Sequence, residues 1–597
     1  MKKSLKIKDK NLIIVIFINL IIFGITNILF NIKYEQVDDF IIYNLYSGLD
    51  GTYNIHGVYI HPIICTIISI FYRILPIINW HSIFLLGMQF ICFTIIGYII
   101  LKKHNNGIAI VLYTIFASVF YVTMLMLIQY TSVAALLILT ALIILIDILE
   151  KKEKTKIKYL IGMYILYTIG IMTRMQSLLI IIPFFGLYFA INLVKYKFQK
   201  QIQKDTIIKM LKYYLIYILI TVVVYVSNII IYNSDEVYKN YMEYNDIRAT
   251  LHDIIYVDYE ENKEIFDEIG WSKNDHYLFY TFNFGDEDIY SKENLKKILD
   301  YKIQKDGKYN FDTNIVEINR NFISESTDSI TYISILFMAL FVISLFKSDR
   351  TKENILIFIA TIGMHILFII MGRSMLRVVI PEYIIGSLLL IYNLNFNVQR
   401  NSKENKDIKI SENYNYNIKN NNEKTDKKKI NDSTKNCTII CFMILIICIF
   451  VGNKYDYGYK LENYENYREL INYTNNHKEN VYLYTVPSLQ DRYLTYSVYQ
   501  MPPKGAFSNL RVMGGWDMYT QNYYDFKKRY NLDGNFLDLL KENVYLIDGD
   551  VYWSGRRYKN YKENVILAIK ENYNVEVTCE KVEEFGNLAI YKIVSNE

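Results

Sequence analysis

The chain has 597 residues, of which 52% are hydrophobic, and its formal net charge at pH 7 is +5. Many of the apolar residues fall in blocks of 17 to 22 residues, close to the ~20 residues that a helix needs to cross the ~30 Å hydrocarbon core of a bilayer. These values exclude an ordinary soluble globular protein, and a small positive charge spread over short loops gives no basis for a nucleic-acid partner.

Eleven apolar blocks predict membrane-spanning helices, so the expected fold is a mainly α, polytopic membrane protein. Five lysines precede the first block as they do in a signal sequence. No small-residue cleavage site follows that block, which indicates a retained signal anchor. The predicted spans are residues 12–30, 81–101, 108–128, 131–149, 157–172, 178–194, 211–232, 330–346, 355–371, 378–394 and 437–451.

A further apolar segment, residues 62–78, decides the topology. It is interrupted by Arg73 and Pro76, and we expect it to lie in the membrane interface as a short amphipathic or re-entrant piece. The segments on the same side of the membrane as the N-terminus then hold 31 lysines and arginines, and the short loops on the opposite side hold 5. Because positive charge gathers on the cytoplasmic side, the sequence predicts a cytoplasmic N-terminus and a C-terminal domain outside the cytoplasm.

Three polar regions lie outside the spans. Residues 233–329 carry 22 acidic and 11 basic residues and include Trp271, which indicates a folded external loop. Residues 401–436 are rich in asparagine and lysine, a composition typical of a disordered linker. Residues 453–597 alternate helical and β-rich stretches, which predicts a small α/β domain. The predicted parts are therefore a transmembrane core (1–400, including the loop 233–329), a cytoplasmic linker (401–436), a last span (437–452) and an external domain (453–597).

An acidic stretch, Glu35-Gln36-Val37-Asp38-Asp39, follows directly on the first span. Ionisable residues at membrane depth are costly and tend to mark functional sites. In inverting glycosyl transfer, a carboxylate accepts the proton of the acceptor hydroxyl as the anomeric carbon is attacked. One of two adjacent carboxylates serves as the base while the other adjusts it. Asp38 and Asp39 are therefore the candidate catalytic residues, the alternative being a solvated loop or a helix cap.

Arginines gather on the same, outer side of the predicted bundle. Arg174 lies at the turn between the fifth and sixth spans, and Arg373 and Arg377 lie at the turn between the ninth and tenth. Guanidinium groups bind phosphate oxygens through two hydrogen bonds and stay charged at membrane depth. These three arginines are the candidates for binding a donor phosphate, the alternative being contact with lipid headgroups.

Four other polar residues share this side, namely His56 and His61 in the first outer loop and Gln129 and Gln176 at outer turns. Histidines could move protons or bind phosphate, and glutamines could bind sugar hydroxyls. All four are therefore candidates for substrate binding. The alternative for each is a local hydrogen bond or the end of a helix.

No cofactor is predicted. The acidic clusters of the 233–329 loop leave a divalent cation possible, but they match no calcium-loop pattern. The six cysteines include no CxxC pair, so neither a disulfide framework nor a cysteine-based metal site is indicated. The turn Gly514-Gly515-Trp516-Asp517 could present an indole to a sugar, or it could be a packed tight turn.

These features resemble the GT-C class of integral-membrane glycosyltransferases, which includes protein O-mannosyltransferases and the aminoarabinose transferases that modify lipid A. The family implies inverting transfer from a polyprenyl-phosphate-linked sugar, with Asp38, by position, as the base. It often has Asp-Glu where this chain has Asp-Asp, which leaves the base open between Asp38 and Asp39. The Trp-Trp-Asp motif of oligosaccharyltransferases is absent, which argues against transfer of a whole glycan to asparagine. The resemblance covers residues 1–400 and rests on Asp38-Asp39 after the first span, His61-Pro62 opening an apolar interfacial helix, Arg373 and Arg377 before Pro381, and an external C-terminal domain.

The expected function is transfer of one sugar from a polyprenyl-phosphate donor to a glycan, lipid or protein acceptor of the cell envelope, at the outer face of the cell membrane. Membrane lipids are the other expected partners, and nucleic acid is not one. Two alternatives are a non-catalytic transporter or flippase of lipid-linked glycan and a membrane protein whose external domain binds cell-wall glycan. A translocation path would need polar residues deep within the spans, whereas most charged residues of the predicted bundle lie at its outer rim.

Overall fold

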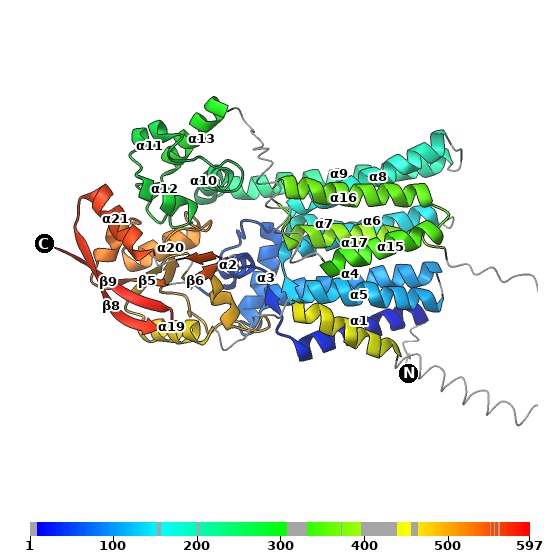
Figure 1. Cartoon of the computed structure of the whole chain (residues 1–597), viewed down its shortest axis with the longest axis horizontal. Helices are drawn as coiled ribbons and strands as arrows, with labels where there is room; N and C mark the ends of the chain where they lie inside the picture. The colour runs from blue at the N-terminus through cyan, green and yellow to red at the C-terminus, as the bar shows by residue number, and fades with distance from the viewer. Residues whose placement is uncertain are drawn as a thin grey trace, which may run out of the picture.

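The computed structural model describes residues 9–104, 106–151, 157–198, 200, 203–306, 331–371, 373–395, 439–454, 464–486, 488–549, 551–553, 556–558 and 561–596. The molecule is elongated, with a bundle of long helices at one end and two lobes at the other (Figure 1). The predicted linker, residues 401–436, lies outside the described residues. The N-terminus lies at the end of the bundle away from the lobes, and the C-terminus lies on a lobe (Figure 1).

Helices dominate the described chain, as the sequence predicts, and eight of the described helices are long and apolar enough to cross a membrane. Three shorter apolar helices, α7 (Ile157–Thr173), α15 (Thr331–Phe346) and Ile439–Lys454, occupy the other predicted spans. All eleven predicted segments are therefore helical, but eight have the length of a span. The eight are α1 (Lys10–Leu29), α4 (Trp80–His104), α5 (Gly107–Met126), α6 (Tyr130–Glu150), α8 (Leu178–Lys197, after the 3-10 turn η1, Met175–Ser177), α9 (Lys204–Asn233), α16 (Thr351–Ile370) and α17 (Leu376–Asn393).

Helices α6 and α17 form the centre of the bundle. In each of them 78% of the membrane-length window is buried inside the protein, whereas 11% is buried in α9. Small residues allow close helix approach in membranes. Gly170 of α7 fits that rule, because a Cβ there would lie 2.8 Å from the Ile138 side chain and 3.0 Å from the Ala134 carbonyl oxygen of α6.

The segment predicted to lie in the interface forms α3 (Pro62–Ile74), a 13-residue helix at the junction of bundle and lobes (Figure 1). Its length corresponds to about 20 Å, too short to cross the hydrocarbon core. His61 caps its N-terminus, accepting a hydrogen bond from the Ile63 N–H, and Pro62 occupies the first helical turn, where its missing N–H is not needed. One face of α3 is buried against the protein, and the other exposes Ile67 and Ile70.

The loop that the sequence predicts to be external folds into a helical lobe, α10 (Glu236–Asp253), α11 (Lys263–Ile269), α12 (Lys273–Tyr280) and α13 (Lys292–Asp306). Trp271 is 3% exposed, and its indole N–H donates to the Ile289 carbonyl at 2.9 Å. Side chains of this lobe and of the C-terminal lobe belong to one continuous hydrophobic core. The two polar regions that are far apart in sequence therefore pack as one body.

The C-terminal lobe is built on a five-stranded sheet of order β4-β3-β5-β9-β8. Strands β4, β3 and β5 are parallel to one another, β9 pairs antiparallel with β5, and β8 pairs antiparallel with β9. The α/β alternation predicted from the sequence is therefore confirmed for the described residues. The elements are α19 (Glu465–Asn476), β3 (Val481–Tyr484), η3 (Gln490–Thr495), β4 (Leu510–Val512), α20 (Gln521–Tyr530), η4 (Phe536–Leu540), β5 (Val544–Gly549), β6 (Val551–Trp553), β7 (Arg556–Tyr558), α21 (Lys562–Tyr573), β8 (Val577–Phe585) and β9 (Leu588–Ser595).

Candidate active site

The acidic stretch is positioned by a two-stranded parallel sheet at the lobe end of the bundle. Strand β1 (Lys33–Tyr34) pairs with β2 (Leu127–Ile128), which joins α5 to α6. The Glu35 N–H continues this ladder by donating to the Ile128 carbonyl at 3.0 Å. The chain then turns into α2 (Asp38–Ser47), which ends at Gly48 with a left-handed φ of 77°. Asp38 and Asp39 thus lie in the first turn of a helix, where the helix dipole favours negative charge.

Asp39 is sealed inside the protein. Its side chain is fully buried, and Oδ1 accepts hydrogen bonds from His81 Nε2 at 2.9 Å and from the Tyr130 N–H at 3.2 Å. The other ring nitrogen of His81, Nδ1, is also hydrogen-bonded and lies 2.5 Å from the Tyr46 hydroxyl. Burial raises the pKa of Asp39, and the hydrogen bond from His81 acts against that rise. The carboxyl group of Asp39 is therefore closed to solvent in this structure.

Asp38, by contrast, is half-buried, and the C-terminal lobe contacts it. Its Oδ1 accepts a hydrogen bond from the indole N–H of Trp516 at 3.3 Å. The backbone at Gly514 has a φ of +132°, and a Cβ there would lie 1.9 Å from the carbonyl oxygen of Phe282. Only glycine fits this turn, which anchors Trp516 between the two lobes. The Gly-Gly-Trp-Asp turn therefore directs its indole to a carboxylate of the bundle.

Arg377 lies at the same place. Its guanidinium donates to the Gln36 side-chain oxygen, and its carbonyl accepts from the Ser132 hydroxyl at 3.1 Å. Burial raises the pKa of Glu35 to about 7, the charge of Arg377 acts against this rise, and the charges of Asp39 and Asp38 add to it. Arg377 of α17 is therefore close to Glu35 and Gln36 of the acidic stretch after α1, although 341 residues separate it from Gln36.

Arg174 reaches the site through two tyrosines. Its guanidinium lies over the Tyr59 ring, 4.5 Å from the ring centre, and 5.5 Å from the centre of the Tyr130 ring, in the geometry of a cation–π contact. Its Nη1 is buried and has no acceptor among the described residues. Trp516 packs edge-on against Tyr59, with ring centres 4.9 Å apart. Tyr59 thus links the arginine to the indole that contacts Asp38.

Four charged side chains influence the pKa of the Tyr59 hydroxyl. Burial raises the pKa of its hydroxyl, the positive charges of Arg248 and Arg174 act against this rise, and the negative charges of Asp38 and Asp253 add to it. These five residues come from α2, α10 and the loops before α3 and α8. Both signs of charge therefore meet around one tyrosine at the junction of bundle and lobes.

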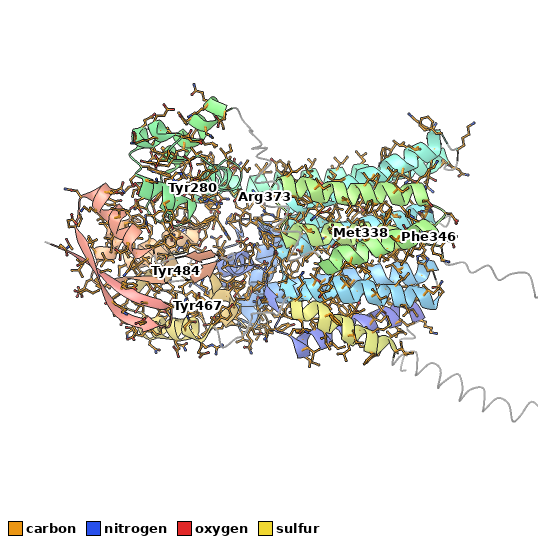
Figure 2. The ribbon with its side chains drawn as sticks, in the orientation of Figure 1. Tyr280, Met338, Phe346, Arg373, Tyr467 and Tyr484 are labelled. Carbon is orange, nitrogen blue, oxygen red and sulfur yellow. The ribbon has the colours of Figure 1, made fainter. Side chains whose placement is uncertain are left out.

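Arg373 has a different partner. It lies where the helical lobe meets the bundle (Figure 2), and its Nη2 donates to the Asp253 carbonyl at 2.9 Å and lies 3.8 Å from the Asp253 carboxylate. Arg373 therefore joins the turn before α17 to the end of α10. Its link to the charges around Tyr59 is through Asp253, whose charge also acts on Tyr59.

The four remaining predicted residues have local partners in the structure. Gln129 caps α6, accepting from the N–H groups of the next residues at 2.5 and 3.1 Å. His61 caps α3 and its Nε2 lies 3.1 Å from the Ser227 hydroxyl. His56 stacks on a tyrosine ring of α10 at 3.9 Å between centres. Burial lowers the pKa of both histidines. Gln176 is exposed in η1. Among the described residues, none of the four forms a hydrogen bond or ion pair with Asp38.

Two residues of the site were not predicted as such. The sequence marks His81 only as the first residue of a span, because nothing in it links this residue to Asp39, 42 residues earlier. Arg248 is 3% exposed, its Nη2 donates to Asn245 at 2.7 Å, and its Nε has no acceptor among the described residues. A signal for Arg248 existed, since it shares one helical face with Tyr241 and Tyr244, and both are buried.

In the part of the chain that the structure describes, no group of three or more histidine, cysteine, aspartate or glutamate side chains is placed to hold a metal ion. Comparison of the chain with protein-family models, with curated proteins and with solved structures gave no match.

Proposed function

We propose that this protein is a membrane glycosyltransferase of the GT-C type, which transfers a sugar from a polyprenyl-phosphate donor to a cell-envelope acceptor. The observation that carries the proposal is the convergence of a half-buried carboxylate, Asp38, with Arg377 and Arg174 at the lobe end of a helical bundle. These residues come from three distant parts of the chain, and their charges lie close to Glu35 and Tyr59. A carboxylate beside arginines is the set of groups that base-assisted displacement of a phosphate requires.

In this mechanism Asp38 accepts the proton of the acceptor hydroxyl as the oxygen attacks the anomeric carbon. The C–O bond to the phosphate breaks on the opposite face of the sugar, so the configuration inverts. Arg377 and Arg174 bind the phosphate, whose developing negative charge they stabilise. The phosphate leaves with the bonding electrons and needs no general acid. Asp39 does not touch substrate but positions Asp38, because its bonds to His81 and Tyr130 fix the first turn of α2.

The proposal includes an orientation. Eleven spans, a cytoplasmic N-terminus and both lobes outside the cytoplasm would place the site at the outer face, where a lipid-linked donor and an envelope acceptor meet. Two features support it, namely the excess of lysine and arginine in the opposite loops and the location of the lobes at the end of the bundle away from the N-terminus (Figure 1). An N-terminal and a C-terminal fluorescent or protease-sensitive tag, tested in intact cells, would locate the two ends.

The decisive experiment is a transfer assay with purified full-length protein and a panel of polyprenyl-phosphate sugars. The wild type should transfer one of them, and Asp38→Asn should reduce turnover at least ~10²-fold, the lower range for removal of a general base. Expression, membrane insertion and thermal unfolding of Asp38→Asn should match the wild type. Turnover by Asp38→Asn close to that of the wild type would refute the mechanism.

One observation favours a second function, transport of a lipid-linked glycan. Glu382 of α17 is fully buried, its carboxylate lies 3.9 Å from His365 of α16, and neither of its oxygens has a hydrogen bond among the described residues. Carboxylates inside spans mark proton and ion pathways in transporters. A transporter would lose function in Glu382→Gln and keep it in Asp38→Asn, whereas the proposed transferase gives the opposite result.

A further inference from the structure

A second hollow lies beside the site, between α2 and the C-terminal lobe. Its empty space of about 510 Å³ includes open solvent, and it is lined by aromatic and charged side chains, among them Phe40, Tyr484, Arg492 and Arg511. Ile41, which also lines it, is three residues after Asp38 and therefore adjacent to it on the surface of α2. The hollow thus begins within one helical turn of the proposed base.

Arg492 is a buried cation of this hollow. It is 7% exposed, and its guanidinium lies between the rings of Phe40 and Tyr484, 5.2 Å from each ring centre. Nη1 donates to the Leu489 carbonyl at 2.8 Å, and no carboxylate pairs with it among the described side chains. A guanidinium has five N–H donors, and a buried charge without a counter-charge is costly. An anion in the hollow would offset that cost.

The other charged groups leave the hollow short of negative charge. Arg511 is 7% exposed and pairs with Asp517 at 3.0 Å, while its Nε has no partner among the described residues. Arg529 donates to the backbone carbonyls of Asp50 and Ser508. Three arginines therefore face two carboxylates, those of Asp50 and Asp517.

We propose that this hollow binds an anionic saccharide, a sugar unit that carries a carboxylate or a phosphate. Arg492 and Arg511 bind the oxyanion, and the Phe40 and Phe507 rings, which meet edge-to-face at 5.3 Å, contact the apolar face of the sugar. That this saccharide is the acceptor rests on the proposed function, in which Asp38 accepts the proton of the sugar hydroxyl bound next to it. The binding itself requires no catalysis.

The test is equilibrium binding to the full-length protein in detergent, measured by saturation-transfer NMR and calorimetry. The probes are D-glucuronic acid and D-glucose 6-phosphate, with D-glucose as the neutral control. At least one anionic probe should bind 10-fold or more tightly than glucose, and comparison of the two identifies which oxyanion is preferred. Equal binding of all three sugars would overturn the proposal without any variant.

Variants then assign the site. Arg492→Gln should weaken binding of the preferred anionic probe at least 10-fold, whereas Arg468→Gln, a change at a more exposed arginine of the same lobe, should leave it unchanged. Arg492→Lys keeps the positive charge but loses the planar guanidinium group, so it should weaken binding less than Arg492→Gln does. It replaces Arg492→Gln in the test if the glutamine variant does not fold. Unchanged binding in the Arg492 variants overturns the proposal. Asp38→Asn should bind the probe as the wild type does, so loss of transfer with retained binding refers to the proposed function and not to this site.

Discussion

The structure predicts that the two adjacent aspartates differ in how much each contributes to the stability of the fold. Asp39→Ala would leave two buried donors, His81 Nε2 and the Tyr130 N–H, without their acceptor. An unsatisfied buried group costs ~1–3 kcal/mol, so the two together should lower the free energy of unfolding by about 2–6 kcal/mol. Asp38→Ala removes only one hydrogen bond, from Trp516 at 3.3 Å to a half-buried carboxylate, and should cost about 1 kcal/mol or less.

The assay is thermal and denaturant-induced unfolding of the two variants in the same detergent, followed by tryptophan fluorescence. His81→Ala is a matched test of Asp39→Ala, because it breaks the same hydrogen bond from the other side. His81→Ala and Asp39→Ala should each destabilise strongly, and the double variant should lose less than the sum, as expected for residues in contact. Equal and small effects of Asp38→Ala and Asp39→Ala would refute the assignment of a structural role to Asp39.

Two further predictions concern the same junction. The pKa of Glu35 is raised to about 7 from 4.5, so its protonated form favours the folded state; that stabilisation is fully present below pH 4.5 and is lost as the pH rises through 7. Glu35→Gln should therefore raise the unfolding midpoint relative to wild type more at pH 8 than at pH 5, and an equal difference at both pH values would contradict the assignment. Gly514→Ala places a Cβ 1.9 Å from the Phe282 carbonyl oxygen at a φ of +132° and should lower the free energy of unfolding by more than about 2 kcal/mol. The control is Gly107→Ala, where no atom lies within 4 Å of the new Cβ. Equal unfolding midpoints of the two variants would show that the turn at Gly514 does not require glycine.

Much of the architecture follows from the sequence because the signals are local. A run of apolar residues forms a helix wherever it lies, and the eleven predicted segments are helical in the described chain. His61-Pro62 begins a helix because a side-chain cap and a proline at the first turn act within four residues. The placement of Asp38 and Asp39 after α1 was readable for the same reason.

The candidate site depended on contacts that no local pattern encodes. Trp516 approaches Asp38 because it belongs to the hydrophobic core that the C-terminal lobe shares with the bundle. His81 meets Asp39 because β1 pairs with β2 beside α4. Sequence alone marked two neighbouring carboxylates but could not separate their roles, because consecutive helical residues point in different directions. Tertiary packing decided that Asp39 is enclosed and that Asp38 is half-buried against Trp516, since burial is a property of the assembled helices and lobes and not of the chain's order.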